Sequence, residues 1–146
     1  MIQLGIGLRD TLTVLVCGGR EYQNYEVVKA ALDDLESEHG IRLLVSGGCT
    51  GADRLARRWA EERGFTPGPS RARPRVWLPK DVTSHKVYME YPALWGSYGR
   101  AAGPVRNKEM LAETHPDIVL AFPGGDGTDG MKKLARKAGV KVAEHG

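Results

Sequence analysis

TVLVCGG at residues 13–19 is a short, largely apolar run that stops at a pair of glycines. A run of this kind is typical of a strand buried on both faces of a parallel sheet. Similar runs lead into Gly-Gly at 41–48 and at 117–125. Because the carboxyl ends of parallel strands share one edge of the sheet, we expect the three glycine-rich ends to lie together.

Helices are indicated after each of these runs. Asn24 can cap a helix that ends before Gly40, within which apolar residues recur at three- and four-residue spacing. The sequence predicts an α/β fold: a single Rossmann-like, doubly wound parallel sheet of about five strands, order 3-2-1-4-5, with helices on both faces. The remaining predicted elements are helices after residue 51, at 104–113 and at about 128–138, and strands at 76–78 and 140–143.

Length and composition indicate one domain over 1–146. With 146 residues, 41% of them hydrophobic and 27% charged, the chain is typical of globular proteins and not of disordered or fibrous ones. No apolar stretch approaches the ~20 residues of a membrane helix, and no signal peptide is evident, so we expect a cytoplasmic protein without membrane contact. The segment 79–103, rich in aromatic residues, is predicted to be an irregular excursion that forms a lid or a subunit contact.

The sequence indicates no metal and no separate cofactor. Cys17 and Cys49 are too few for a disulfide framework or a four-ligand zinc site, and both are expected to be interior free thiols. The 4 histidines show no metal-ligand spacing. A net charge of +3 suits an anionic ligand without requiring nucleic acid.

The glycine clusters at the strand ends are the candidate ligand site. Glycine lets the backbone approach a phosphate closely, and the following helix adds the positive end of its dipole. One cluster alone is equally consistent with a tight turn, but three at one edge favour phosphate binding. The first cluster is not GxGxxG and the second lacks the Lys-Ser/Thr of a P-loop, so dinucleotide dehydrogenases and P-loop hydrolases are poor interpretations. The candidates in these clusters are Gly18, Gly19, Gly47, Gly48, Thr50, Gly51, Gly124, Gly125, Gly127 and Thr128.

The order of four motifs carries a family resemblance: VCGGREY at 16–22, SGGCTGAD at 46–53, AGPVRNKEM at 102–110 and FPGGDGT at 122–128. Over about residues 13–144 the chain resembles the SLOG superfamily of Rossmann-like proteins, and within it the YspA branch. The resemblance implies that the PGGxGT motif starting at Pro123 holds a ligand phosphate. It also implies that Arg106 and Asn107 serve the site, with Arg106 as the candidate catalytic residue. Since SLOG relatives are commonly oligomers, we expect a homo-oligomer, a dimer or larger.

The superfamily includes the LOG phosphoribohydrolases, whose catalytic glutamate stands three places after the threonine of PGGxGT. Met131 occupies that place here, and a methionine cannot stabilise an oxocarbenium-like transition state. Four other carboxylates could substitute, although each also has a structural interpretation, at a helix start or on a solvated loop. They are Glu21, Asp53, Asp126 and Asp129.

Several arginines outside the RNKEM motif could either bind a ligand or form ion pairs on the surface. Arg20, directly after the first glycine pair, is either a ligand-facing cation or part of a surface ion pair. Arg57 and Arg58 stand four residues before Glu61 and Glu62, the spacing of solvated ion pairs on a helix. The arginines of the loop at 71–75 are less easily explained, so DNA binding of the DprA kind stays a minor alternative.

We therefore predict a binding or sensing module for a nucleotide or nucleotide-derived ligand, such as a nucleoside monophosphate or an ADP-ribose-like molecule, with Asp53 among the ligand-binding residues. The main alternative is a LOG-like phosphoribohydrolase that cleaves the N-glycosidic bond of a nucleoside monophosphate. Because GGDGT also occurs in NAD and diacylglycerol kinases, kinase chemistry is a minor alternative.

Overall fold

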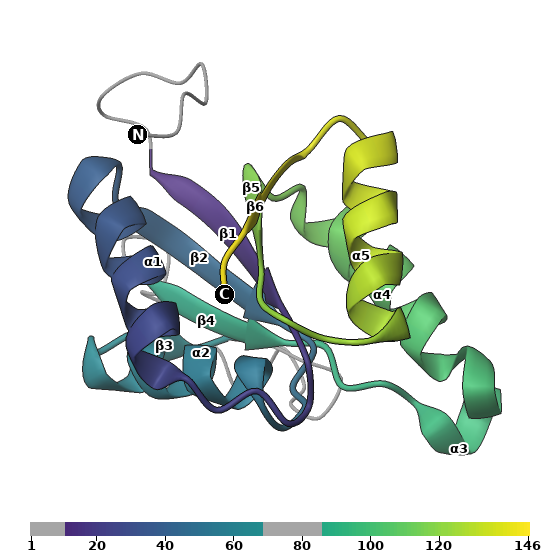
Figure 1. Ribbon diagram of the computed structural model, residues 1–146. Coiled ribbons are helices and arrows are strands. Elements are labelled where there is room, and N and C mark those ends of the chain that lie inside the picture. The colour runs from purple at the N-terminus through teal and green to yellow at the C-terminus, as the bar shows by residue number, and fades with distance from the viewer. Residues whose placement is uncertain (1–10, 69–85) are drawn as a thin grey trace.

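The computed structural model describes residues 11–68 and 86–146. Within these residues six strands form one sheet, in the order β3-β4-β2-β1-β5-β6, and every pairing is parallel (Figure 1). The strands are β1 (Leu12–Cys17), β2 (Ile41–Ser46), β3 (Thr66–Pro67), β4 (Val87–Glu90), β5 (Ile118–Ala121) and β6 (Lys141–Glu144).

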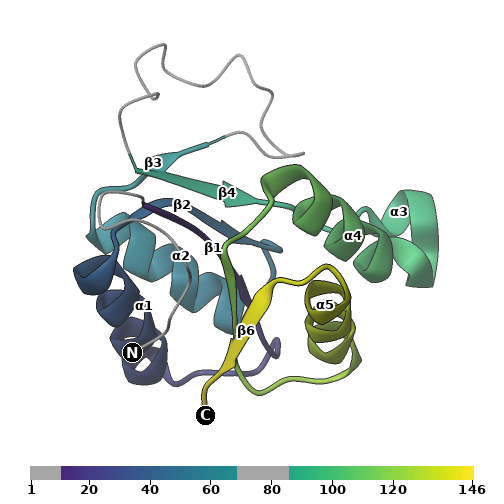
Figure 2. The same cartoon turned by 90° about the horizontal axis from the view of Figure 1, so that it is seen from above.

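Helices cover both faces of the sheet. Figure 2 shows α1 and α2 on one side and α4 and α5 on the other, which is the doubly wound arrangement that the sequence predicts. None of the helices described is long and apolar enough to cross a membrane. The helices are α1 (Tyr25–Glu38), α2 (Ala52–Glu62), α3 (Trp95–Tyr98), α4 (Ala102–Thr114) and α5 (Asp126–Lys137), with a 3₁₀ turn at Gly99–Ala101.

The sheet differs from the prediction beside β2. The strand that pairs with β2 on this side is β4, with Val87 opposite Leu43. Strand β4 lies inside the segment 79–103, for which we expected irregular structure. The predicted strand at 76–78, and the arginines of the loop at 71–75, lie outside the described residues. With β4 taken as the third strand, the predicted order 3-2-1-4-5 holds, and the two-residue β3 is added at the edge.

The central strand β1 explains why the molecule has two apolar cores. All 6 residues of β1 are buried, and successive side chains of a strand point to opposite faces. Val14 and Val16 therefore join the core that contains residues of α1 and α2, such as Trp59. Leu15 joins the other core, on the α4 and α5 side, with Met131.

The predicted helix boundaries hold to within about two residues. Asn24 caps α1, since its side chain accepts a hydrogen bond from the amide of Val27, and Gly40 follows with a φ of +83°. Helix α4 begins at Ala102, before the predicted Pro104, so the proline lies in its first turn. Helix α5 begins at Asp126, two residues earlier than expected.

Candidate ligand-binding cleft

The ends of β1, β2 and β5 open into one cavity of about 890 Å³. Its lining contains parts of all three glycine clusters together with the first turns of α4. Three predicted residues, Gly48, Thr50 and Gly51, are not part of it. The predicted residues that line the cavity are Gly18, Gly19, Arg20, Gly47, Asp53, Arg106, Asn107, Pro123, Gly124, Gly125, Gly127 and Thr128.

The first two glycine turns pack against each other. A Cβ on Gly51, whose φ is +72°, would clash with the carbonyl oxygen of Gly19. Thr50 Oγ1 donates a hydrogen bond of 3.1 Å to the carbonyl oxygen of Arg20, which joins the two turns. The close approach that requires glycine at Gly51 is therefore an approach between two parts of this chain, as the tight-turn interpretation expects.

Backbone amides at the end of β1 and the start of α2 are also already used. The amide of Gly19 donates to the carbonyl oxygen of Pro123 at 2.8 Å, which joins the first turn to the third. The amide of Ala52 donates to the carbonyl oxygen of Gly19 at 3.1 Å. These two amides are engaged within the protein and cannot serve as donors to a phosphate unless those bonds break.

Asp53 holds the second turn from below. Its Oδ2 accepts a hydrogen bond of 3.2 Å from the amide of Cys49, and the amide of Gly47 also donates to the carboxylate. The carboxyl is buried, and this desolvation raises its pKa from 3.8 to about 6, although the two amides and the guanidinium of Arg106 oppose the shift. At this turn the carboxylate takes the amides that an external anion would use.

The third turn, at the start of α5, is different. Gly125 is the N-cap residue of α5 and, as a glycine, has no side chain with which to cap the helix. A Cβ added to Gly125 or to Gly127 would meet no atom within 4 Å in the structure as described. Because the first amides of a helix lack intrahelical acceptors, this exposed helix start offers donors and a positive dipole end to an anion in the cavity.

Arg106 and Asn107 connect the second and third turns. Arg106 Nη1 donates to the carbonyl oxygen of Gly47 at 2.8 Å, and Arg106 Nε donates to Asn107 Oδ1, also at 2.8 Å. Asn107 Nδ2 then donates to the carbonyl oxygen of Gly127 at 3.2 Å. Both side chains are buried. The pair that the family resemblance singled out therefore fixes the position of two turns of the cleft.

Other predictions about charged and thiol groups have mixed outcomes. Arg20 forms no ion pair with the described residues; its guanidinium lies 5.2 Å from the centre of the Trp95 ring. Cys17 is buried as expected, but the expectation of an interior Cys49 was wrong, since Cys49 is half-buried and lines the cavity. Its Sγ accepts a long hydrogen bond of 3.8 Å from Arg106.

Of the four alternative carboxylates, three line the cavity: Glu21, Asp53 and Asp126. Asp129 points elsewhere and pairs with Lys132 at 3.4 Å. Met131 is fully buried in the apolar core and takes no part in the lining. No three His, Cys, Asp or Glu side chains of the described segments lie close enough together to hold a metal ion.

Sequence reasoning missed several lining residues. Tyr22 and Arg100 line the cavity, as does Trp95 from the aromatic segment. The sequence does carry one further signal for the cleft. The residues 125–130 read GDGTDG, which has the order GxGxxG, and they lie at the start of α5. No comparable pattern marks Tyr22, which follows β1 in a loop, or Arg100, which lies in the 3₁₀ turn.

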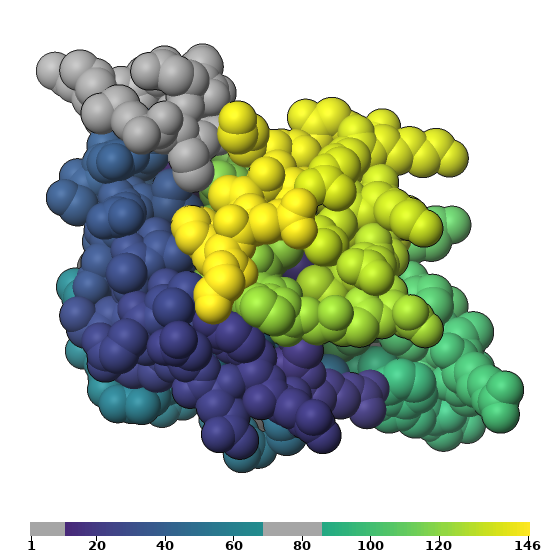
Figure 3. Space-filling view, in the orientation of Figure 1, coloured from purple at the N-terminus to yellow at the C-terminus, as the bar shows by residue number. Residues whose placement is uncertain are grey.

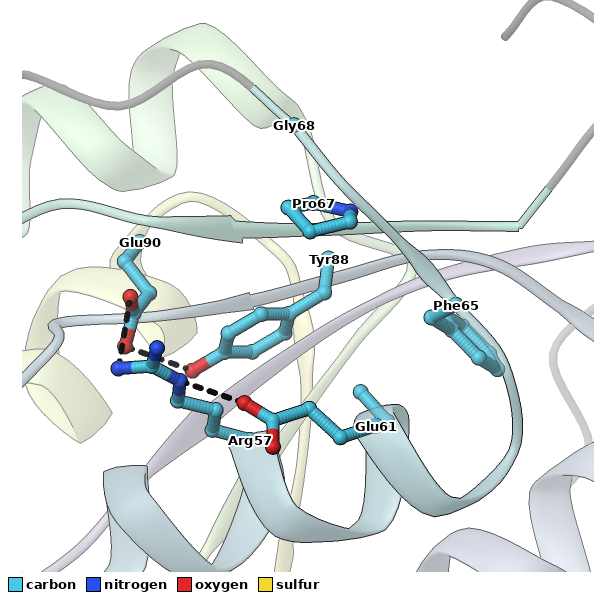
Figure 4. A pocket seen from close by; sticks show the side chains of 8 residues that line it. Arg57, Glu61, Phe65, Pro67, Gly68, Tyr88 and Glu90 are labelled. Carbon is cyan, nitrogen blue, oxygen red and sulfur yellow. Dashed lines mark hydrogen bonds and ion pairs between the residues drawn. The ribbon is translucent and has the colours of Figure 1, made fainter. Parts of the chain in front are cut away.

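A second, smaller cavity of about 180 Å³ lies between α2, β3 and β4 (Figure 4). The hydroxyl of Tyr88 shares a hydrogen bond of 2.8 Å with Ser46 Oγ and donates to Glu90 at 3.1 Å. Arg57 pairs with Glu61 at 2.8 Å, as the sequence predicts, and approaches Glu90 at 3.7 Å. Because these polar groups satisfy one another, the larger cavity is the better candidate site.

Comparison with known proteins identifies relatives. A model of the YspA, cpYpsA-related SLOG family matches residues 12–75. Over 140 residues the chain is 34% identical to the Gene 61 protein of Mycobacterium phage D29, which covers 91% of this chain and 95% of that protein.

A solved structure shares the fold of this chain. The Moco carrier protein from Chlamydomonas reinhardtii matches with a TM-score of 0.54 and 21% identity, over 93% of this chain and 76% of that chain. DNA processing protein A (DprA) from Streptococcus pneumoniae matches at a TM-score of 0.43 and 24% identity, over 91% of this chain and 58% of that chain. From its sequence and its Rossmann-like architecture, the chain belongs to the YspA, cpYpsA-related SLOG family.

Proposed function

We propose that the cleft binds the phosphate of a nucleotide or nucleotide-derived ligand at the start of α5, and that the protein acts as a binding or sensing module. The observation that carries this proposal is the uncapped first turn of α5, where Gly125 and Gly127 line the cavity and a Cβ added to either would meet no atom within 4 Å. A helix start of this kind is well suited to an anion.

The rest of the cleft supports a ligand larger than phosphate alone. A volume of about 890 Å³ falls within the range of small-molecule sites. Arg20 and Arg100 add two cationic side chains to the lining, while Glu21 and Asp126 add acceptors for hydroxyl or amino groups. This mixture fits a molecule with an anionic end and a polar, uncharged remainder.

The test is a thermal unfolding series with AMP, ADP-ribose and ribose 5-phosphate, with adenosine as the ligand that lacks a phosphate. A ligand present at 100 times its Kd adds about 2.7 kcal/mol to the free energy of unfolding, so binding raises Tm measurably. We expect the phosphorylated compounds to raise Tm more than adenosine does. If no phosphorylated compound raises Tm, the proposal is wrong.

A matched pair of variants locates the binding. Gly127→Ala and Gly130→Ala both replace a glycine of α5 beside which a Cβ meets nothing within 4 Å. Both should stabilise the helix slightly. Only Gly127 lines the cavity, so Gly127→Ala should reduce the ligand-induced rise in Tm, while Gly130→Ala should keep it. An equal effect of both variants would place the phosphate elsewhere.

Turnover separates binding from hydrolysis. A binding module raises Tm with AMP and releases no adenine, whereas a phosphoribohydrolase releases adenine that chromatography detects. Adenine release that disappears in Asp126→Asn would show that a carboxylate of the lining replaces the glutamate that is absent at Met131.

A further inference from the structure

Trp95 occupies an unusual place on the surface. It lies in α3, which with the following 3₁₀ turn forms an arm, residues 94–101, that projects from the body of the molecule at the lower right of Figures 1 and 3. Three large apolar side chains of the described residues are exposed, all on this arm: Leu94 at 38%, Trp95 at 47% and Tyr98 at 46%. Of the three, only Trp95 lines the cleft.

The indole of Trp95 is positioned by two sides of the cleft mouth. The guanidinium carbon of Arg20, from the turn after β1, lies 5.2 Å from the centre of the ring. On α4, a Cβ at Gly103 would lie 3.7 Å from the Cη2 atom of the indole, an ordinary van der Waals distance, so the ring edge lies beside the first turn of this helix. Trp95 therefore spans the mouth from the first turn to the start of α4.

We propose that Trp95 and Arg20 form the subsite for the planar base of the ligand, with the indole stacked on an aromatic nitrogen heterocycle such as a purine. This inference rests on the proposed function, because it requires the phosphate to lie at the start of α5. The heterocycle presents a π-face that a flat indole or guanidinium contacts without needing a particular hydrogen-bond pattern. Trp95 is large, half-exposed and part of the cleft lining, so its ring is available to stack on such a heterocycle.

The chemistry of the mouth supports a base over a second sugar or phosphate. A cation beside an indole attracts the electron-rich face of a heterocycle and stabilises the ring that it lies against. The carboxylate of Glu21, next to Arg20 in the chain and also in the lining, supplies an acceptor for an exocyclic amino group. The subsite therefore favours aminated purines such as adenine.

The experiment compares AMP with ribose 5-phosphate, which carries the phosphate and the sugar but no base, by isothermal titration calorimetry on the full chain. Trp95→Ala should weaken AMP binding by about ten-fold, the magnitude of one lost stacking contact, and leave ribose 5-phosphate binding unchanged. Trp95→Phe should restore most of the affinity. Tyr98→Ala, an equally exposed aromatic residue of the same helix that is not part of the cleft lining, should change neither affinity.

Each other outcome contradicts a defined part of the account. Equal affinity of the wild-type protein for AMP and ribose 5-phosphate, or no effect of Trp95→Ala on AMP, overturns the base subsite and leaves the phosphate site intact. Equal weakening of both ligands in Trp95→Ala means that the indole only supports the fold of the mouth. Failure of both ligands to bind the wild-type protein overturns the base subsite, and failure of ADP-ribose as well overturns the proposed function itself. A change of oligomeric state in Trp95→Ala with both affinities unchanged assigns the indole to an interface between copies of the chain.

Discussion

Arg106 Nη1 lies 2.8 Å from the carbonyl oxygen of Gly47, a residue 59 positions earlier in the chain. The same nitrogen donates to the carbonyl oxygen of Tyr91 at 3.1 Å. One buried guanidinium thus joins α4 to the backbone at the ends of β2 and β4. The cleft depends on this junction for its shape.

Arg106→Ala should lower the free energy of unfolding by about 3 kcal/mol, because it removes charge-assisted hydrogen bonds and leaves buried carbonyl groups without donors. Urea denaturation measures the change. Arg106→Lys, which keeps the charge but not the geometry of two donating nitrogens, should recover only part of the loss. Arg100→Ala, an exposed arginine of the same cleft, should change the stability by less than about 0.5 kcal/mol. Equal losses in the Arg106 and Arg100 variants would contradict the structural role.

Because of Asp53, the free energy of unfolding should decrease as the pH rises. Its pKa is raised in the folded protein to about 6 from 3.8, so the folded state holds the proton more tightly than the unfolded state does. The resulting stabilisation is complete below pH 3.8 and is lost as pH rises through 6, by up to about 3 kcal/mol. Asp53→Asn should remove this pH-dependent component. The measurement compares the free energies of unfolding of the wild-type protein and the variant from pH 4 to pH 7.5. A constant difference across that range would show that Asp53 does not titrate there. Asp129→Asn serves as the exposed control.

The two thiols should react at very different rates. Both cysteines line the cleft, but Cys17 is buried and Cys49 only half-buried. Desolvation together with the charge of Asp53 raises the pKa of Cys17 to about 12. With Ellman's reagent at pH 8 we expect one reactive thiol in the folded protein and two in urea. Cys49→Ser should abolish the reaction of the folded protein, and Cys17→Ser should not. Rapid labelling of folded Cys49→Ser would contradict the burial of Cys17.

Met131→Glu should unfold or strongly destabilise the protein without creating a hydrolase. Met131 is fully buried among apolar side chains, including Leu15 and Ala135, so a carboxylate there loses its hydration without gaining a partner. We expect a loss of at least about 3 kcal/mol by urea denaturation, against less than about 1.5 kcal/mol for the volume-conserving Met131→Leu. A stable Met131→Glu protein that releases adenine from AMP would show that this position can turn toward the cleft.

The sequence predicted most of the fold but not the strand that lies beside β2. Strands β1 and β5 are continuous apolar runs, a pattern that few structures other than a buried strand produce. Strand β4 is only four residues long, with Lys86 before it and Glu90 at its end, so its apolar run is too short to mark a strand by itself. Its place beside β2 is decided by tertiary pairing, which no local pattern reveals.

For the cleft, the positions of the glycine turns could be predicted, but the use of their amides could not. The parallel-sheet rule brings the three turns to one edge. Whether an amide is available to a ligand depends on acceptors elsewhere, such as the carboxylate of Asp53 below Cys49 and the carbonyl oxygen of Pro123 opposite Gly19. Those partners lie far apart in the chain or point inward, so only the three-dimensional arrangement identifies α5 as the turn that remains open.

The central place of β1 has a consequence for synthesis on the ribosome. The amide of Thr13 donates to Asp117, 104 residues later, at the start of the neighbouring strand β5. At about 5–20 residues per second, one edge of β1 waits about 5–20 s for its neighbour to be translated. Until then the cleft cannot assemble, and an unpaired apolar strand edge is open to aggregation. A chain that stops before residue 118 would therefore be a target for chaperones or proteases.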